Sequence, residues 1–399
     1  MRDFLMIYRA ENGSDIMSQT EGKYLESLQK QYAEAHKKER GQILDEYVQT
    51  TGYHRKYAIL VLSRKRVRKT QPAKRPRASV YTAEDARALE KVSDLFEGIN
   101  AKLLRVALDN ELKHLYDSGF LSISRACYER LKHISPATID RLRQRYGRGL
   151  PPRVKRGHTK PGTLLKSQIR VRTWAEWDED RPGFTEMDLV AHDGGDASGD
   201  FAHTLNFTDI KTGWTECAAA RNKAQIYVFA ALKQVRARLP FPLLGIDSDN
   251  GAEFINDELL RYANQEHLTF TRSRPGRKND GAHVEQKNWS VVRRYVGDLR
   301  YDTPAQVALL NQLYEVLHLY VNFFLPVVKL KEKVRHGNKV TKKYDAPQTP
   351  YQRVLACPDI PAKIKTKLRA QYAQLDVVAL HQQIERLVKP LWASGRRLA

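Results

Sequence analysis

The spacing of apolar residues in this 399-residue chain changes at about residue 183. Upstream, apolar residues recur at the intervals of amphipathic helices, whereas downstream short strand-like runs alternate with helical segments. The expected order from this point is three strands, helix, strand, helix, strand, helix. The expected strands are 184–191, 204–210, 214–220, 242–247 and 267–272. This order predicts a mixed five-stranded α/β sheet with flanking helices, in which ligands gather at strand ends.

The charge balance indicates the kind of partner. The chain has 68 Lys and Arg residues against 46 Asp and Glu residues, a formal net charge of +22. Such a surplus favours a polyanionic partner. No apolar run reaches the roughly 18 residues that a membrane span needs, so nucleic acid is favoured over membrane. The alternative at this point is a merely basic or ribosome-associated protein.

The three cysteines, Cys127, Cys217 and Cys357, lie far apart and form no CxxC pair. This pattern disfavours a structural zinc site and a disulfide framework, and it fits a reducing cytosol.

Two basic, proline-bearing stretches at 64–77 and 151–162 divide the chain. Either stretch can lie along a phosphate backbone, or it can be a solvated linker without specific contacts. The expected segments are an N-terminal helix-turn-helix at 1–66, a basic linker at 67–80, a second helical DNA-binding domain at 81–150, a basic linker at 151–180, the α/β domain at 181–325, and a basic, partly helical segment at 326–399. The helical spacing at 361–392 in this last segment predicts a helical pair, which either packs on the core or binds DNA or another protomer.

A short basic helix is expected near the end of the second helical domain. Ser135 is a suitable N-cap, Pro136 suits the first helical position, and Gly147 suits the stop. Its polar face carries Arg141, Arg143 and Arg145. A basic helix after a turn is typical of a recognition helix in the DNA major groove, so these arginines are candidate DNA contacts. The alternative is a surface helix of an all-helical domain.

Three carboxylates fall on separate elements of the α/β domain. Asp188 lies mid-strand, Asp249 follows the apolar run 242–247, and Glu285 begins a helix after the glycine-bearing segment 274–281. A carboxylate within an apolar strand is costly unless a charge or hydrogen bonds compensate. Three such groups can hold two hard divalent cations, although a lone acid is more often an N-cap or an ion-pair partner. Asp247 is the alternative to Asp249, which we prefer because the Asn250-Gly251 turn places it at the sheet edge.

The sequences around these three carboxylates resemble those of a known family. The sequence MDLVAH at 187–192, DSDNGAEF at 247–254 and HVEQKN at 283–288 resembles the catalytic core of DDE transposases and retroviral-type integrases. More narrowly, residues 184 to about 345 resemble bacterial insertion-sequence transposases with an integrase core. Thirty-five residues (250–284) separate Asp249 from Glu285, and this interval occurs together with the Asp-Asn-Gly turn. The resemblance implies an RNase H-like fold, with Asp188, Asp249 and Glu285 as the catalytic and metal-binding triad.

The mechanism implied by the family uses two Mg²⁺ or Mn²⁺ ions. One activates water, or later a DNA 3′-hydroxyl, and the other stabilises the leaving oxygen. Lys287, Arg293 and Arg294 follow Glu285 and are candidate contacts to DNA phosphates. The implied partners are transposon ends and target DNA, bound by a homo-oligomer, without a membrane. The implied location is the bacterial cytoplasm, in association with the nucleoid.

The chain departs from the family in two places. It lacks the cysteines for the N-terminal zinc module of retroviral integrases, and its loop at 192–196 is acidic and glycine-rich. Asp193 and Asp196 in this loop are either plain loop residues or accessory metal contacts. Two other functions stay open: a DNA-binding protein or repressor with an inactive integrase core, and an RNase H-like nuclease without strand transfer.

Overall fold

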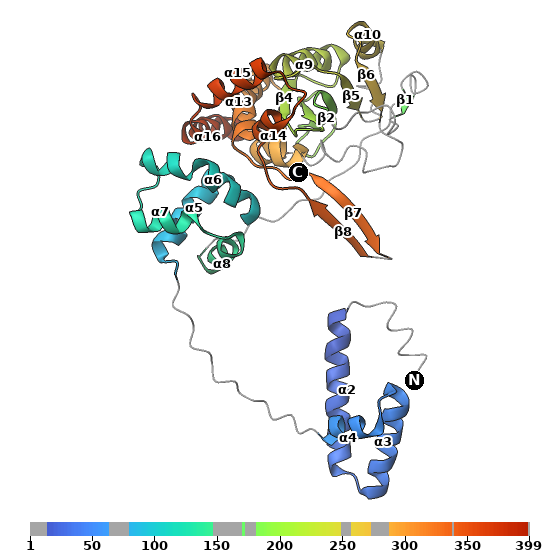
Figure 1. Ribbon diagram of the computed structural model, residues 1–399. Coiled ribbons are helices and arrows are strands. Elements are labelled where there is room, and N and C mark those ends of the chain that lie inside the picture. Colours follow the sequence, from blue (N-terminus) through green and yellow to red (C-terminus); the bar gives the residue numbers. More distant parts are fainter. Residues whose placement is uncertain are drawn as a thin grey trace. The chain divides into compact units, whose positions relative to one another are not determined.

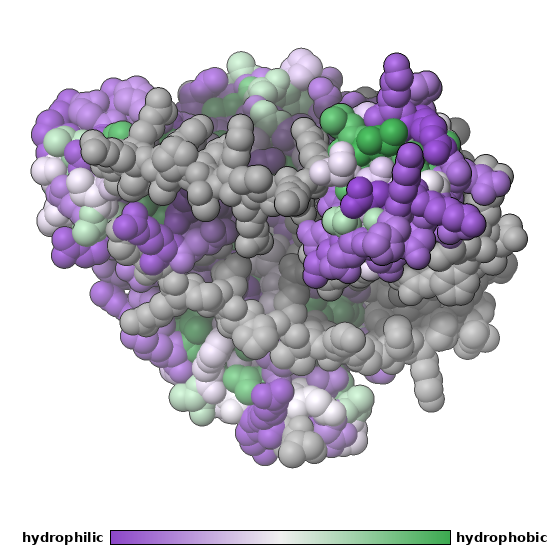
Figure 2. Space-filling view, turned by 90° about the horizontal axis from the view of Figure 1, so that it is seen from below, coloured by the Kyte–Doolittle hydropathy of each residue, from purple (hydrophilic) through white to green (hydrophobic). Residues whose placement is uncertain are grey.

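The computed structural model describes residues 14–63, 80–146, 170–171, 181–248, 257–272, 287–336 and 339–397. The chain divides into two compact units, Met1–Ala78 and Ser79–Ala399, and each is described by itself (Figure 1). Within the described residues, no helix is both long enough and apolar enough to cross a membrane. Hydrophilic side chains predominate on the face shown in Figure 2, and the hydrophobic ones form small separate groups.

The first unit consists of helices with a small core. Its helices are α2 (Ser14–Glu34), α3 (Lys37–Thr51) and α4 (Arg55–Ser63). Gly52 ends α3 in the left-handed region, at φ 72°, where its N–H donates to the Val48 carbonyl. Glycine adopts this conformation without a Cβ clash. The core contains the buried side chains of Leu44, Ala58 and Leu62. The segment expected at 1–66 is therefore helical where the structure describes it, and its assignment as a DNA-binding helix-turn-helix stays a prediction.

The second unit begins with four helices. They are α5 (Ala83–Leu95), α6 (Ala101–Asp117), α7 (Arg125–Lys132) and α8 (Pro136–Tyr146). Polar caps fix their starts: the Asn100 side chain accepts from Lys102 and Leu103 N–H groups, and Ser124 accepts from Cys127. Such caps satisfy backbone donors that have no partner within the helix.

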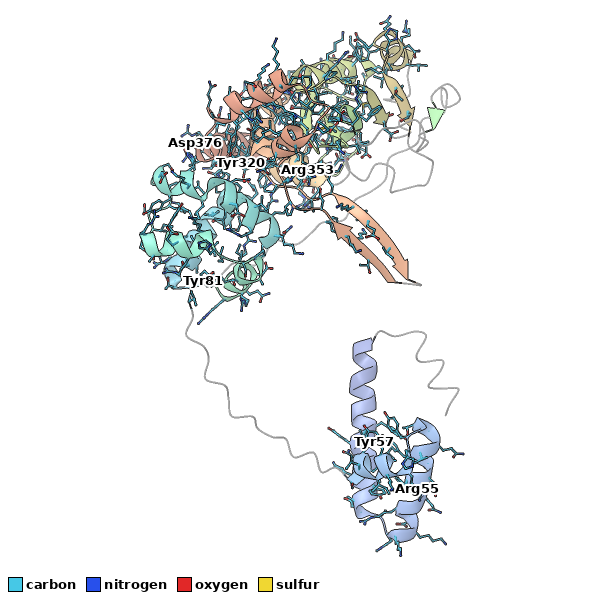
Figure 3. All side chains as sticks on the ribbon, viewed as in Figure 1. Arg55, Tyr57, Tyr81, Tyr320, Arg353 and Asp376 are labelled. Carbon is cyan, nitrogen blue, oxygen red and sulfur yellow. The ribbon has the colours of Figure 1, made fainter. Side chains whose placement is uncertain are left out.

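These helices pack on the elements that follow them in the chain. Their buried leucines belong to the same apolar cluster as those of α13 (Pro304–Phe323) and α16 (Val377–Ser394). Polar contacts join the same parts: Tyr320 donates to the Leu95 carbonyl, and His114 contacts Asp376 at 2.9 Å (Figure 3). Residues 80–146 thus share a core with the α/β part of the chain.

The α/β part contains a six-stranded sheet. Its strands are β1 (Arg170–Val171), β2 (Phe184–Ala191), β3 (His203–Asp209), β4 (Thr215–Ala220), β5 (Gly245–Ser248) and β6 (Thr269–Arg272). Their order is β1-β6-β5-β2-β3-β4. Strands β2, β3 and β4 pair antiparallel, whereas β5 pairs parallel with both β2 and β6. The five longer strands are those expected from the sequence, and their order and directions define an RNase H-like fold.

Helices cover both faces of this sheet. On one face, Met187, Leu205, Phe207 and Ile246 pack in one apolar cluster with residues of α9 (Gln225–Arg238) and α10 (Asp257–Gln265). The other face is more polar and meets α13 and the π-helix η1 (Asn288–Arg293), which continues into α12 (Arg294–Val296). Successive strand residues point to opposite faces, so one strand can supply both surfaces.

Helix α13 closes the outer edge of β4. Asn322 accepts from the Thr215 N–H and donates to the Thr215 carbonyl, both at 2.8 Å. Asn311 makes the same pair of hydrogen bonds with Ala219, and Arg238 donates to the carbonyl of Cys217. An open strand edge is a site for pairing with other chains. Side-chain amides therefore take the place of a further strand at this edge.

The chain ends with a hairpin and three helices. The hairpin pairs β7 (Leu330–His336) with β8 (Lys339–Tyr344), and the helices are α14 (Pro350–Ala356), α15 (Ala362–Tyr372) and α16. The helical pair expected at 361–392 forms, and α16 packs along α13. The Trp392 indole N–H donates to the Tyr295 carbonyl at 2.6 Å. The pair packs on the core, and its binding of DNA or another protomer stays a prediction.

Candidate active site

Asp188 lies in a row of polar side chains that crosses the sheet. It pairs in register with Asn206 on β3, which in turn pairs with Cys217 on β4. Paired residues on adjacent strands point to the same face. Asn206 is fully buried, whereas Asp188 is only partly buried. The row therefore runs from buried residues on β4 and β3 to a partly exposed carboxylate on β2.

Asn288 joins this row to the helix that follows Glu285 in sequence. Its Nδ2 donates to Oδ2 of Asp188 at 2.5 Å, and its Oδ1 accepts from Nδ2 of Asn206 at 2.7 Å. The other oxygen of Asp188, Oδ1, accepts the Leu189 N–H at 2.8 Å. The π-helix η1 begins at Asn288, and π-helical turns are frequent at functional sites.

Two more carboxylates, Glu186 and Asp247, occupy the same face deeper in the sheet. They are paired in the parallel register of β2 and β5 and are 2% and 1% exposed. Thr271 Oγ1 donates to Asp247 at 2.6 Å, so a neighbouring strand holds this carboxylate. Asp247 was the alternative to Asp249, and its burial leaves it less accessible than Asp188.

Asp249 and Glu285 lie outside the described residues. The described part of the chain contains no group of three or more His, Cys, Asp and Glu residues that could hold a metal ion. Of the predicted triad, the structure therefore places Asp188 alone.

The three cationic residues that follow Glu285, which were predicted to contact DNA, have different surroundings. Lys287 is partly buried, and burial lowers its pKa to about 8. Arg293 is buried, donates to the Ala191 and Gly297 carbonyls, and pairs with Asp298 at 3.2 Å. Arg294 pairs with Glu97 at 3.2 Å. In this structure Arg293 and Arg294 hold parts of the protein together, and their contact with DNA stays a prediction.

The helix predicted from Ser135 to Gly147 corresponds to α8. Arg141 and Arg145 are exposed on it, and Arg141 donates to Thr138 Oγ1 at 2.9 Å. Arg143 instead donates to the Ile99 carbonyl at 2.6 Å and to Ser93 Oγ at 2.7 Å. Burial also lowers the pKa of Arg143. Arg143, which the sequence places on the polar face of this helix, therefore packs α8 against the preceding helices.

The acidic loop after β2 is organised around Arg300. Its guanidinium donates to the carbonyls of Asp196 and Ser198, both at 2.8 Å. Asp193 accepts the Gly195 N–H, and Asp196 accepts both the N–H and the hydroxyl of Ser198. The Ser198 hydrogen bonds lower the pKa of Asp196. These are local turn contacts, as expected of loop residues.

Sequence reasoning missed Asn206 and Asn288. Asn206 falls on a strand between apolar residues, and Asn288 comes three residues after Glu285. A buried amide within a strand needs a hydrogen-bond partner, which was the available signal for Asn206. The identity of that partner depends on how η1 packs on the sheet, which spacing alone does not give.

Comparisons with solved structures give matches at low similarity. The human T-lymphotropic virus HTLV-2 integrase catalytic core, solved with magnesium, is 14% identical, covers 37% of this chain and 90% of its own, and has a TM-score of 0.28. The simian T-cell lymphotropic virus intasome, solved with a PP2A regulatory subunit, is 14% identical, covers 63% and 76%, and has a TM-score of 0.31. The BIV integrase catalytic core is 15% identical, covers 48% and 99%, and has a TM-score of 0.27.

The strand order and the strand directions place the second unit in the class of proteins with an RNase H-like fold. No protein-family model matches the chain. The uncharacterized protein y4rM of Sinorhizobium fredii (strain NBRC 101917 / NGR234) is 38% identical over 338 residues, which cover 85% of this chain and 96% of that protein. This chain belongs to the same family as y4rM.

Proposed function

We propose that this protein is a DDE transposase, which binds the ends of an insertion sequence and catalyses DNA cleavage and strand transfer. Such an enzyme is both a DNA endonuclease and a polynucleotidyl transferase, and it serves DNA recombination and integration. The observation that carries the proposal is the Asn288 bridge, which fixes an accessible Asp188 carboxylate against the helix that follows Glu285. A fold alone does not determine function, so the proposal rests on this site.

The sheet register supports Asp249 as the second carboxylate. The parallel pairs run from Phe184 with Gly245 to Met187 with Ser248. One more step of the same register would pair Asp188 with Asp249. Side chains of paired residues share a face, so we propose that these two carboxylates are neighbours.

The position of Asn288 supports Glu285 as the third carboxylate of the triad. Residues three apart on a helix lie on the same side of it. Asn288 contacts Asp188 directly, and Glu285 precedes it by three residues. We therefore propose Glu285 as the third carboxylate of the centre.

The chemistry of these donors fits hard divalent cations. Magnesium prefers oxygen ligands and keeps several waters, so carboxylates and a DNA phosphate suffice. When bound, two such ions would supply an activated water or 3′-hydroxyl and stabilise the leaving oxygen. Asn288 would hold the Asp188 carboxylate in one orientation through its hydrogen bond to Oδ2.

DNA binding is proposed to involve residues outside this centre. Arg141 and Arg145 are exposed on α8, and the net charge of +22 favours a polyanion. We propose that α2–α4 and α5–α8 contact the element ends, and that the protein acts as a homo-oligomer on paired ends. A bacterial cytoplasmic, nucleoid-associated location follows from this role.

A plasmid assay tests the proposal. The substrate is a supercoiled plasmid that carries the genomic sequences flanking this gene, and the variants are Asp188→Asn, Asp249→Asn and Glu285→Gln. We expect Mg²⁺-dependent cutting and joining by wild type, and loss of both by each variant with end binding retained. The matched control is Asp117→Asn, an exposed carboxylate on α6 that pairs with Lys113.

Other outcomes would replace the proposal. Binding of the ends without metal-dependent cutting would indicate a repressor with an inactive core. Cutting without joining would indicate an RNase H-like nuclease. Full activity of Asp188→Asn would contradict the assignment of the triad.

A further inference from the structure

Trp289 presents a large aromatic ring at the surface beside the proposed centre. It follows Asn288 directly in the chain and is 45% exposed. The Asn288 amide donates to the Asp188 carboxylate at 2.5 Å, and consecutive Cα atoms lie about 3.8 Å apart. Trp289 therefore flanks the side chain that holds Asp188.

Two other tryptophans of the chain differ from Trp289 in their partners. Trp214 is 2% exposed, and its indole N–H donates to Glu216 Oε1 at 2.8 Å. Trp392 is 49% exposed, yet its indole N–H donates to the Tyr295 carbonyl at 2.6 Å. Among the residues that the structure describes, the Trp289 indole has no hydrogen-bond partner and its ring stacks on no other ring. The ring and the N–H of Trp289 are therefore open to a partner outside the described residues.

The backbone of Trp289 is fixed although its ring is exposed. The Arg294 N–H donates to the Trp289 carbonyl, which is the hydrogen bond between residues five apart that defines a π-helix. Val291 and Val292, which follow on η1, are 4% and 0% exposed and anchor this helix in the apolar cluster. A tryptophan has only two side-chain torsions, so it supplies a large contact area at a low cost in conformational entropy.

Two explanations for an exposed tryptophan differ in what they require. Single apolar side chains are scattered over most protein surfaces and need no partner. That explanation does not account for a position next to the residue that holds Asp188, on a type of helix that is frequent at functional sites. A stacking site for a nucleobase requires an open ring on a fixed backbone, close to where a DNA phosphate is held. Trp289 has the open ring and the fixed backbone, and the proposed function supplies the phosphate at Asp188.

We propose that Trp289 stacks on one nucleobase of the DNA strand whose phosphodiester lies at the Asp188 centre. This inference rests on the proposed function, which supplies DNA as the ligand. Aromatic side chains bind unpaired bases in this way with little sequence preference, because every base has a π-face. A base that leaves the duplex for the indole opens the strand beside the scissile phosphate. Trp289 thus holds the strand in place and takes no part in the bond changes.

Fluorescence anisotropy with the full chain tests this inference through a double-mutant cycle, in which a base and the Trp289 ring are removed separately and together. The probes are labelled duplexes of the genomic sequence that flanks this gene, one intact and the others each with a single abasic site at a different position. EDTA prevents cleavage. The variants are Trp289→Ala and Trp289→Phe, of which the second keeps an aromatic ring. The matched control is Trp392→Ala, because Trp392 is exposed to a similar degree and packs on the neighbouring helix α12.

We expect Trp289→Ala to bind the intact duplex about tenfold more weakly than wild type, and Trp289→Phe to retain most of the affinity. On a duplex that lacks the stacked base, wild type and Trp289→Ala should bind equally, because neither forms the stack. Trp392→Ala should follow wild type on every duplex. A loss of the same size in Trp289→Ala on all duplexes would overturn the proposal, in favour of a contact between Trp289 and protein. Equal binding of the intact duplex by wild type and Trp289→Ala would overturn it too.

The result is separable from that of the plasmid assay. A base-dependent effect of Trp289→Ala, with no cleavage by wild type, would remove the proposed enzyme activity and support stacking in a DNA-binding protein. Cutting and joining by wild type, with equal binding of all duplexes by wild type and Trp289→Ala, would remove this inference alone. Failure of wild type to bind any of the duplexes would overturn both.

Discussion

The two faces of the central sheet are built from the same strands but differ in chemistry. The face toward α9 and α10 carries Met187, Leu205, Phe207 and Ile246 in a closed apolar cluster. The face toward η1 and α13 carries Asp188 and a row of buried polar groups that hydrogen-bond to one another. Burial of apolar area on the first face stabilises the fold. Burial of a polar group on the second face costs free energy unless that group finds a hydrogen-bond partner. The first face therefore holds the sheet together, whereas the second is the face on which we propose that catalysis occurs.

The largest expected effect lies on the apolar face. Phe207 is fully buried there, and Phe207→Ala should lower the free energy of unfolding by about 3 to 5 kcal/mol, because it leaves a cavity. The folded fraction should retain its rate of DNA cleavage. Urea unfolding and a cleavage assay on the same sample check this. A loss below about 1 kcal/mol, or a selective loss of cleavage, would break the distinction between the faces.

The apolar face was also the part that the sequence predicted well. Short strand-like runs between helical segments gave the five longer strands and their flanking helices, because each pattern reports which side of an element is buried. The mid-strand position of Asp188 was visible for the same reason. Spacing did not show that Arg143 packs against Ile99 and Ser93, or that Asn288 reaches Asp188. These contacts join residues far apart in sequence and depend on tertiary packing.

The next effect concerns the polar face. Asn288→Ala should lower the rate of metal-dependent cleavage by about 10- to 100-fold, because the Asp188 carboxylate loses the group that orients it. Thermal unfolding should change little in comparison with Phe207→Ala. Asn288→Asp is the harsher companion variant, since it places two carboxylates in contact. An unaltered cleavage rate in Asn288→Ala would mean that Asn288 only packs η1 on the sheet.

A third variant tests whether loss of any buried side-chain amide slows cleavage, or only loss of Asn288. Asn322→Ala removes both hydrogen bonds to Thr215 at the edge of β4, and should cost about 2 kcal/mol of unfolding free energy. Its cleavage rate per folded molecule should equal that of wild type. Chemical denaturation beside single-turnover cleavage makes the comparison. A rate loss as large as that of Asn288→Ala would show that the distinction between site and scaffold amides is wrong.

The smallest expected effect is a pH dependence of the unfolding free energy, which comes from the buried side chain of His203. Burial lowers the pKa of His203 to about 4, from an ordinary value of 6.5. The unfolded chain therefore binds more protons than the folded one between these values, and stability falls as the pH drops below 6.5. At pH 5.5 this residue should cost about 1.4 kcal/mol relative to pH 8. The difference in unfolding free energy between wild type and His203→Gln should shift by that amount, and a constant difference would refute it.

Direct measurement of cation binding tests the central claim that the polar face around Asp188 is a metal-dependent catalytic centre. Isothermal titration calorimetry of the full chain with Mn²⁺, without DNA, should show binding in wild type and in Asp117→Asn. In Asp188→Asn the affinity should fall by about tenfold or more, with unfolding unchanged. Equal Mn²⁺ binding by wild type and Asp188→Asn would contradict the claim, whatever the activity on DNA.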